Sequence, residues 1–228
     1  EKQILAKYGA PTPQALVDSA LYHARLLERF DFNNIVISIK SSNVPSMIAA
    51  YRLAAAQMDY PLHLGVTEAG TRRMGIIKSA VGIGSLLCDG IGDTIRVSLT
   101  DDPIEEVRAA RDILKAVGKG TGVEIVSCPT CGRTQIDLIA LAERVEKALA
   151  DCNKPIKVAV MGCAVNGPGE AREADIGIAG GNGEALLFKK GVPYGKYPEE
   201  QILDVLLEEI GRMERSEERR VGKECNNQ

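Results

Sequence analysis

The chain has 228 residues, of which 45% are hydrophobic and 26% charged, and its formal net charge is −3. This length allows one large domain or two modest ones, and the composition is that of an ordinary globular protein. A nucleic-acid-binding surface would bring an excess of lysine and arginine, which the slightly acidic balance argues against. No apolar stretch approaches the roughly 20 residues of a membrane span, and no secretory signal pattern is present, so we expect a cytoplasmic protein.

Six cysteines are too few for a disulfide scaffold, and a CxxC motif in a chain without a signal favours metal or redox use. Among them, Cys88 and Cys152 are interpreted as ordinary buried thiols. The chain opens at Glu1 without an initiator methionine and soon enters a helical pattern, which is typical of the middle of a longer protein.

Residues 12–120 alternate predicted helices and strands. The helices are expected over residues 13–30, 44–58 and 72–87 and from Asp102-Pro103 onward, and the strands over residues 34–40, 62–66 and 94–99. Strand–helix repeats of this kind predict a parallel sheet.

Each predicted strand carries apolar residues on one face and mixed residues on the other. The mixed faces include Lys40, His63 and Arg96, with the charged groups toward the C-terminal ends of the strands. In a β/α barrel, active sites lie at that end. Only three or four βα units are recognisable, whereas a closed barrel needs eight, so a half barrel would expose its interior and two sheet edges.

After the glycine-rich residues 119–122 a second, smaller α/β unit is predicted. Strands are expected over residues 123–126, 157–161, 175–179 and 185–188, and helices over residues 136–149 and 198–213. Glycines 180, 181 and 183 predict a hairpin between the last two strands. The sequence thus divides into residues 1–120, residues 121–213 and a charge-dense tail over residues 214–228, which we expect to be disordered and foreign to the protein.

Three cysteines and a glutamate predict a metal centre. The CxxC pair Cys128 and Cys131 can hold one centre, Cys163 ends an apolar run, and Glu170 follows in Asn-Gly-Pro-Gly-Glu. Spacing alone leaves an iron–sulfur cluster, a zinc site and a redox dithiol open and favours the cluster. A structural zinc site would need a fourth ligand, but Cys152 lies in a polar loop and both histidines are far upstream. The carboxylate indicates one exchangeable ligand.

Four further side chains at the strand ends are candidates for substrate chemistry. Lys40, Arg96 and Ser98 are suited to anchoring phosphate, although each taken alone is equally well explained as a strand-end polar group. Glu68 ends its strand in the same place and can donate or accept a proton. His63 lies deeper and is better explained as a hydrogen-bonded core histidine.

The motifs together resemble one enzyme family. Ser-Cys-Pro-Thr-Cys-Gly-Arg and Met-Gly-Cys-Ala-Val-Asn-Gly-Pro-Gly-Glu-Ala, preceded by His-Leu-Gly-Val-Thr-Glu-Ala-Gly and Gly-Ile-Gly-Asp-Thr-Ile-Arg-Val-Ser-Leu, closely resemble the hydroxymethylbutenyl diphosphate synthases of the methylerythritol phosphate route to isoprenoids. The resemblance covers residues 1 to about 213 in matching motif order.

This resemblance implies an α/β architecture, the C-terminal part of a TIM-type β/α barrel followed by a small iron–sulfur domain. It implies a 4Fe–4S cluster, a diphosphate-binding site and a catalytic carboxylate. The implied cluster ligands are Cys128, Cys131, Cys163 and Glu170, the implied substrate-binding residues are Lys40, Arg96, Ser98 and Asn166, and Glu68 is the implied catalytic carboxylate, with Glu170 as the displaceable ligand.

The implied reaction is a two-electron reductive ring opening. Methylerythritol cyclodiphosphate loses a hydroxyl and becomes hydroxymethylbutenyl diphosphate, with flavodoxin or ferredoxin as electron donor and a homodimer whose active site lies between subunits. About half of the family's barrel precedes Glu1, so we expect this chain alone to be inactive. A zinc-stabilised non-catalytic protein and a simple iron–sulfur electron carrier remain the alternatives.

Overall fold

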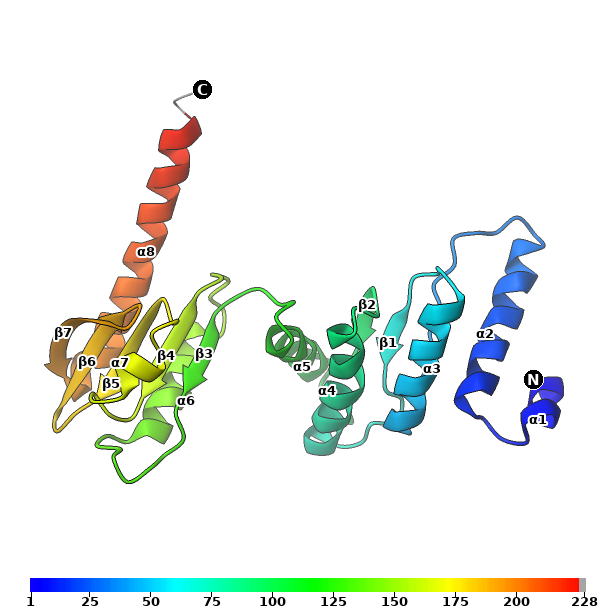
Figure 1. The fold of residues 1–228 in the computed structure, drawn as a ribbon, viewed down its shortest axis with the longest axis horizontal. Coiled ribbons are helices and arrows are strands. Elements are labelled where there is room, and N and C mark those ends of the chain that lie inside the picture. The colour runs from blue at the N-terminus through cyan, green and yellow to red at the C-terminus, as the bar shows by residue number, and fades with distance from the viewer. Residues whose placement is uncertain (226–228) are drawn as a thin grey trace. The chain divides into compact units, whose positions relative to one another are not determined.

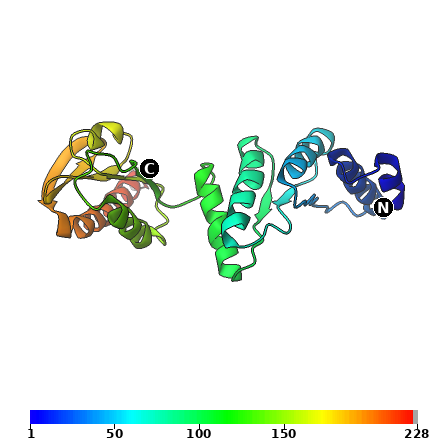
Figure 2. The ribbon, with the colours of Figure 1, turned by 90° about the horizontal axis from the view of Figure 1, so that it is seen from below.

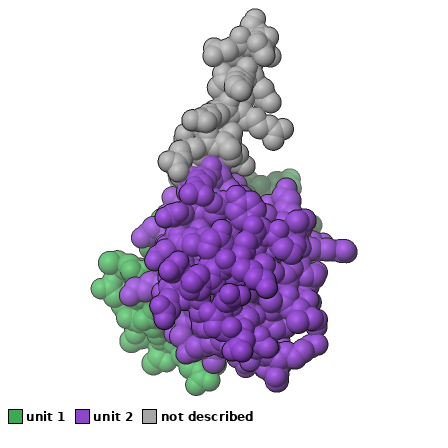
Figure 3. Space-filling model, turned by 90° about the vertical axis from the view of Figure 1, so that its left-hand side faces the viewer, with its two compact units in different colours: residues 1–120 green, residues 121–228 purple. Residues whose placement is uncertain are grey.

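The computed structural model describes the backbone of residues 1–225 and side chains up to residue 213. The chain forms two compact units, unit 1 over residues 1–120 and unit 2 from residue 121 onward (Figure 3). Each unit has its own hydrophobic core. Within the described residues, no helix is both long enough and apolar enough to cross a membrane.

Unit 1 begins with three helices and then alternates two short strands with two further helices (Figure 2). Its elements are α1 (Lys2–Tyr8), α2 (Pro13–Glu28), α3 (Val44–Gln57), β1 (His63–Gly65), α4 (Arg72–Cys88), β2 (Thr94–Arg96) and α5 (Pro103–Ala116). The two strands pair in parallel, with His63 opposite Thr94, which confirms the predicted parallel arrangement. Local sequence signals start the helices: Thr12, Asn43 and Asp102 each accept a backbone N–H as N-cap, and a proline occupies the first turn.

The predicted strand over residues 34–40 differs from a regular strand. It is extended, but it pairs with the β1 segment only through two isolated bridges, Ile37 with Leu62 and Ser41 with Val66. The first two hydrogen bonds of this pairing follow the regular parallel pattern. Ile37 N–H donates to the Pro61 carbonyl at 2.9 Å, and His63 N–H donates to the Ile37 carbonyl at 2.8 Å.

A tyrosine hydroxyl occupies the place of the next ladder bond. Regular pairing would join Ile39 N–H to the His63 carbonyl. Instead, Ile39 N–H donates to the Tyr51 hydroxyl at 2.9 Å, and that hydroxyl donates to the His63 carbonyl at 2.5 Å. Tyr51, on α3, is fully buried. The inserted hydroxyl keeps both backbone groups hydrogen-bonded while it separates the strands, which explains why this strand is interrupted.

The faces of the unit 1 strands follow the predicted parity. Ile35, Ile37, Ile39, Leu62, Leu64, Val66 and Val97 are buried. They form one core with the inner sides of α2, α3, α4 and α5. The opposite face includes Val36, which is 60% exposed, and the polar groups at the strand ends. The helices therefore cover one side of these strands and leave the polar side open within the described unit.

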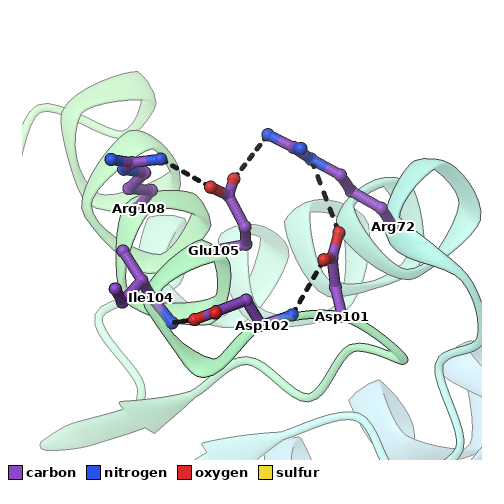
Figure 4. Close-up of polar contacts among 6 residues, drawn as sticks. All are labelled: Arg72, Asp101, Asp102, Ile104, Glu105 and Arg108. Carbon is purple, nitrogen blue, oxygen red and sulfur yellow. Dashed lines mark hydrogen bonds and ion pairs between the residues drawn. The ribbon is translucent and has the colours of Figure 1, made fainter.

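The loops that follow β1 and β2 are held together at the C-terminal ends of the strands. Thr71 bridges to Thr100, and Thr100 N–H donates to the Gly70 carbonyl at 3.1 Å. Arg72, at the start of α4, pairs with Glu105 and lies 3.8 Å from Asp101 (Figure 4). Because Arg72 is largely exposed, this network fixes geometry more than it adds stability.

Replacing Tyr51 by phenylalanine should destabilise unit 1 by about 1–3 kcal/mol, because the Ile39 N–H and the His63 carbonyl lose their shared partner inside the core. Chemical denaturation monitored by circular dichroism measures the change. Tyr22→Phe on the exposed side of α2 is the matched control and should change stability little, since its side chain is 47% exposed. Equal stability of the two variants would contradict the inserted-hydroxyl interpretation.

Unit 2 is a mixed five-stranded sheet with helices on both faces (Figure 1). Its elements are β3 (Glu124–Ser127), α6 (Leu138–Leu149), β4 (Lys157–Met161), α7 (Gly167–Glu170), β5 (Ile176–Gly180), β6 (Glu184–Lys189), β7 (Val192–Pro198), the 3₁₀ turn η1 (Glu199–Gln201) and α8 (Ile202–Cys225). Strands β3, β4 and β5 are parallel, and β5, β6 and β7 are antiparallel, which confirms the predicted hairpin.

Along β4 and β5, the two faces of this sheet carry side chains of different size. Branched residues such as Val158 and Ile178 pack against α6 and α8. The other face presents Ala159 and Ala179, together with Met161, and packs against the segment around α7. Small side chains there let a short helix approach the sheet closely.

Two unit 2 elements are absent from the sequence prediction, and one extends beyond it. β7 contains two prolines and a glycine, residues that are tolerated on an edge strand but do not predict one. α7 is a single turn within a glycine–proline sequence. The α8 backbone is helical to Cys225, whereas the sequence predicts disorder from residue 214; glutamate, arginine and lysine are good helix formers and can continue an existing helix. Residues 226–228 of the predicted tail lie outside the described residues.

A buried ion-pair group ties α8 to β6. Glu209 is only 4% exposed, and it pairs with Lys189 at 2.6 Å and with Arg212. The hydrogen bond from Lys189 is the main reason that the pKa of Glu209 lies below its ordinary value. A carboxylate with a lowered pKa stabilises the fold above its unfolded pKa, and this contribution is lost as the pH falls through the folded pKa.

Glu209→Gln should therefore lower the stability of unit 2 by about 1–3 kcal/mol at neutral pH. The difference from wild type should begin to shrink as the pH falls through about 4.3, the ordinary pKa of glutamate, and should vanish only below the lowered pKa of the folded state, where the carboxyl group is protonated in both states. Urea denaturation of both proteins across this pH range provides the measurement. Glu208→Gln, at a 70% exposed side chain of the same helix, is the control. A pH-independent loss would show that the charge of Glu209 is not the cause.

Candidate functional site

The four predicted metal ligands line one pocket of about 260 Å³ in unit 2. Cys128, Cys131, Cys163 and Glu170 share this pocket with Pro129, Arg133, Thr134 and Gly162. The strand pairing explains their proximity: Ser127 at the end of β3 lies opposite Val160 near the end of β4, so the chain leaves both parallel strands at the same sheet edge.

Backbone hydrogen bonds fix the two cysteine loops. Gly162 N–H donates to the Cys128 sulfur at 3.2 Å. Cys131 N–H donates to Thr134 Oγ1 at 3.1 Å, and Thr134 N–H donates to the Cys131 carbonyl at 3.0 Å, so the segment between them is a closed turn. A Cβ at position 162 would lie 2.9 Å from Thr134 Oγ1, so only glycine fits there without displacing the turn.

A single helical turn brings Glu170 to the thiols. Gly167 N–H donates to the Cys163 carbonyl at 3.0 Å, and Glu170 N–H donates to the Asn166 carbonyl at 2.9 Å. A Cβ at Gly167 would approach the Met161 and Ala179 side chains to about 3 Å or less, so the start of α7 is pressed against the sheet. Asn166 itself is half-buried at the N-cap position of α7 and does not line the pocket.

Arg133 places a positive charge beside these donors. Its backbone N–H and its guanidinium both hydrogen-bond Cys131 and lower the pKa of that thiol. The pKa of Arg133 is raised in turn by Cys131 and, through charge alone, by Cys163 and Glu170. Because the thiolate is the form that binds metals, this arrangement favours metal binding. No sequence motif singles out Arg133; its place two residues after Cys131 is the available signal.

The donor set fits a metal centre with soft and hard ligands. Three sulfurs and one carboxylate surround a cavity, and Arg133 lowers the pKa of one of the thiols, that of Cys131. In the described part of the chain, no three His, Cys, Asp or Glu side chains are arranged to hold a single metal ion as they stand. The donors thus line the walls of a cavity and do not converge on one point.

A second group of functional candidates lies on the polar face of unit 1. Lys40 is close to β1, where a Cβ at Gly65 would lie 3.2 Å from Lys40 Cε and 2.9 Å from the Arg96 carbonyl. His63 Nδ1 and Thr94 Oγ1 are 2.7 Å apart across the strands. Burial lowers the pKa of His63, and the positive charges of Lys40 and Arg96 lower it further. Burial and then Arg96 also lower the pKa of Lys40.

Lys40 and Arg96 therefore interact with each other as like charges. No carboxylate forms an ion pair with either of them among the residues that the structure describes. Neighbouring cations without a counter-ion, together with a histidine, favour binding of an anion. His63, which the sequence analysis interprets as a core histidine, belongs to this group because its ring is half-buried beside both cations.

Glu68 and Ser98 lie on the loops that leave β1 and β2, which the Thr71–Thr100 bridge holds side by side. Glu68 is exposed, and its backbone has a left-handed conformation with a φ of 51°, which residues other than glycine rarely adopt. Backbone strain of this kind is concentrated at functional sites. No hydrogen bond or ion pair joins either residue to Lys40 or Arg96 within the described range.

Cys88 and Cys152, the other two cysteines whose side chains the structure describes, are less buried than the sequence predicts. The prediction that both are buried is wrong for Cys88, which is exposed at the last residue of α4, beyond the buried Leu86 and Leu87. Cys152 is half-buried and packs against the unit 2 core just after α6. Neither of them lines the pocket.

The electrostatic link between Lys40 and His63 can be measured directly. Lys40→Met removes a nearby positive charge, so the pKa of His63 should rise toward the ordinary value of about 6.5. It should stay below that value, because burial is the larger cause. NMR titration of the imidazole signals measures the shift. Lys78→Met on α4 is the control, and an equal response to both substitutions would contradict the arrangement.

Unit 1 and unit 2 define a two-part α/β protein with a basic strand face in one part and a cysteine–glutamate pocket in the other. Comparison with known proteins places this combination in a family. The GcpE TIM-barrel domain matches residues 1–111, and the GcpE protein C-terminal domain matches residues 124–212. The chain belongs to the GcpE family.

Curated relatives agree with this assignment. The chain is 62% identical over 210 residues to a protein of Clostridium perfringens, 64% identical over 214 residues to one of Clostridium acetobutylicum and 58% identical over 214 residues to one of Geobacter sulfurreducens. All three are named 4-hydroxy-3-methylbut-2-en-1-yl diphosphate synthase (flavodoxin). The matches cover 92–93% of this chain and 60–61% of each relative, so the chain spans about 60% of their length.

Proposed function

We propose that the chain is the C-terminal part of an iron–sulfur oxidoreductase of isoprenoid biosynthesis. The reaction is the conversion of 2-C-methyl-D-erythritol 2,4-cyclodiphosphate to 4-hydroxy-3-methylbut-2-enyl diphosphate by two-electron reductive ring opening with loss of a hydroxyl group. Unit 1 is then the C-terminal portion of a TIM-type barrel that binds substrate, and unit 2 is the iron–sulfur domain. The names of the relatives support the identity of the product, and the resemblance of the motifs supports the identity of the substrate.

The observation that carries the proposal is the pocket shared by Cys128, Cys131, Cys163 and Glu170. Its volume of about 260 Å³ accommodates a group larger than a single ion, and thiolates are the protein ligands of iron–sulfur clusters. When bound, a 4Fe–4S cluster supplies electrons to the substrate. Three thiolates leave one position for a carboxylate, and Glu170 on its short helix is the displaceable ligand.

The barrel residues have binding and proton-transfer roles in this proposal. Lys40 and Arg96 are neighbouring cations that pair with no carboxylate among the described residues; they hold the diphosphate, and Ser98 contributes a hydroxyl from the adjoining loop. Glu68, at the strained turn after β1, donates or accepts a proton as the catalytic carboxylate. Asn166 at the start of α7 contacts substrate next to the metal ligands.

The names of the relatives and the motif resemblance also suggest the partners of the proposed enzyme. The relatives' names specify flavodoxin, so flavodoxin, or ferredoxin in its place, is the proposed electron donor. A homodimer with the active site between subunits, and a cytoplasmic location, complete the proposal. The competing electron-carrier function leaves the neighbouring cations Lys40 and Arg96 on the polar face of unit 1 unexplained.

Anaerobic loading with iron and sulfide tests the centre. The chain should take up both, become brown and lose its visible absorbance on reduction with dithionite. Cys128→Ser and Cys163→Ser should abolish uptake, because each removes a thiolate from the pocket. Glu170→Cys should retain the cluster. When the same substitution is introduced into a protein of the full length of the relatives, it should abolish turnover. Iron and sulfide analysis with absorbance spectroscopy provides the readout.

Cys88→Ser is the matched control for the loading experiment, since Cys88 is exposed on unit 1 and should not affect uptake. A colourless chain that binds zinc in a one-to-one ratio and takes up no sulfide would support the zinc-stabilised alternative. A loaded Glu170→Cys variant with full turnover would contradict the role of the carboxylate as the displaceable ligand.

A further inference from the structure

Arg133 is the single basic side chain among the described residues that line the metal pocket. The other charged groups that can form there are three thiolates and the Glu170 carboxylate, which are all negative. Within the described residues no ion pair joins the Arg133 guanidinium to a carboxylate elsewhere on the surface. Its charge is therefore available to the pocket.

The backbone around Arg133 is rigidly defined. Arg133 lies inside the turn that Cys131 and Thr134 close with two hydrogen bonds, 3.1 Å and 3.0 Å long. Gln135 N–H continues this attachment by donating to the Gly162 carbonyl at 3.1 Å. The turn is thus joined to the loop that precedes Cys163, and the Arg133 side chain projects from a fixed base at the edge of the pocket.

The guanidinium acts on several of the donors at once. Arg133 lines the same pocket as Cys131, Cys163 and Glu170 and lies inside the turn that Cys131 and Thr134 close, so its positive charge lies beside these donors. Hydrogen bonds to ligand sulfurs and nearby charge are two of the determinants of the reduction potential of an iron–sulfur cluster. An electron that arrives at the site adds a negative charge to a set that is already negative, so a nearby cation stabilises the reduced state.

We propose, building on the proposed function, that Arg133 is a positioning residue whose positive charge offsets that of the thiolate and carboxylate ligands. It raises the reduction potential of the centre and thereby assists its reduction by the electron donor. The contribution is electrostatic, so a lysine at position 133 fulfils it in part, whereas an uncharged side chain of similar size does not.

The test compares Arg133→Gln and Arg133→Lys with the wild-type chain after anaerobic loading. Iron and sulfide content is measured first, and the midpoint potential is then determined by a redox titration monitored by electron paramagnetic resonance. Arg133→Gln should shift the potential to more negative values, and Arg133→Lys should remain nearer to wild type. Arg144→Gln on the exposed side of α6 is the matched control and should leave the potential unchanged.

Each outcome decides the proposal. Loss of the cluster in Arg133→Gln with retention in Arg133→Lys supports a charge effect, as does the predicted order of potentials. An Arg133→Gln protein that holds the cluster at the wild-type potential overturns the proposal. An equal loss of cluster or an equal shift of potential in both variants also overturns it, because the effect then depends on the shape of arginine and not on its charge. A wild-type chain that takes up no cluster contradicts the proposed function itself, whereas the other two results contradict the role of Arg133 alone.

Discussion

The parallel pairing of β3 with β4 is the constraint on which the unit 2 pocket depends. Parallel neighbours end at the same sheet edge, so the loop with Cys128 and Cys131 and the loop with Cys163 leave the sheet together. The turn after β3 is then joined to β4 by the Gly162–Cys128 and Gln135–Gly162 hydrogen bonds. The thiols are thus brought together by strand pairing and by the hydrogen bonds of the two loops.

The short helix α7 depends on the other property of this sheet, its difference in side-chain size. Alanines and a glycine on one face let Gly167 press against Met161 and Ala179, and this contact carries Glu170 to the pocket. The opposite face needs bulky residues to hold α6 and α8. Alternation along β4 and β5 therefore serves the core on one side and the site on the other.

Much of this arrangement was predictable from the sequence, because periodicity and spacing are local properties. The alternation of elements in unit 1, the hairpin and the four pocket donors follow from such patterns. The Tyr51 hydroxyl in the strand ladder depends on how α3 packs over two strands, which no local pattern records. Arg133 was missed for a related reason: ligand spacing identifies the groups that bind a metal, but not the charge that balances them.

Lys40 and Arg96, which pair with no carboxylate in the described part of the chain, make the stability of unit 1 depend on the ions in solution. Lys40 and Arg96 repel each other in the folded state, and unfolding relieves that repulsion. Any anion that binds only the folded face stabilises it in proportion to the logarithm of its concentration. A phosphate or pyrophosphate ion that binds this face would therefore raise the melting temperature of unit 1, and melting temperatures measured with and without that ion would describe different liganded states of the same fold.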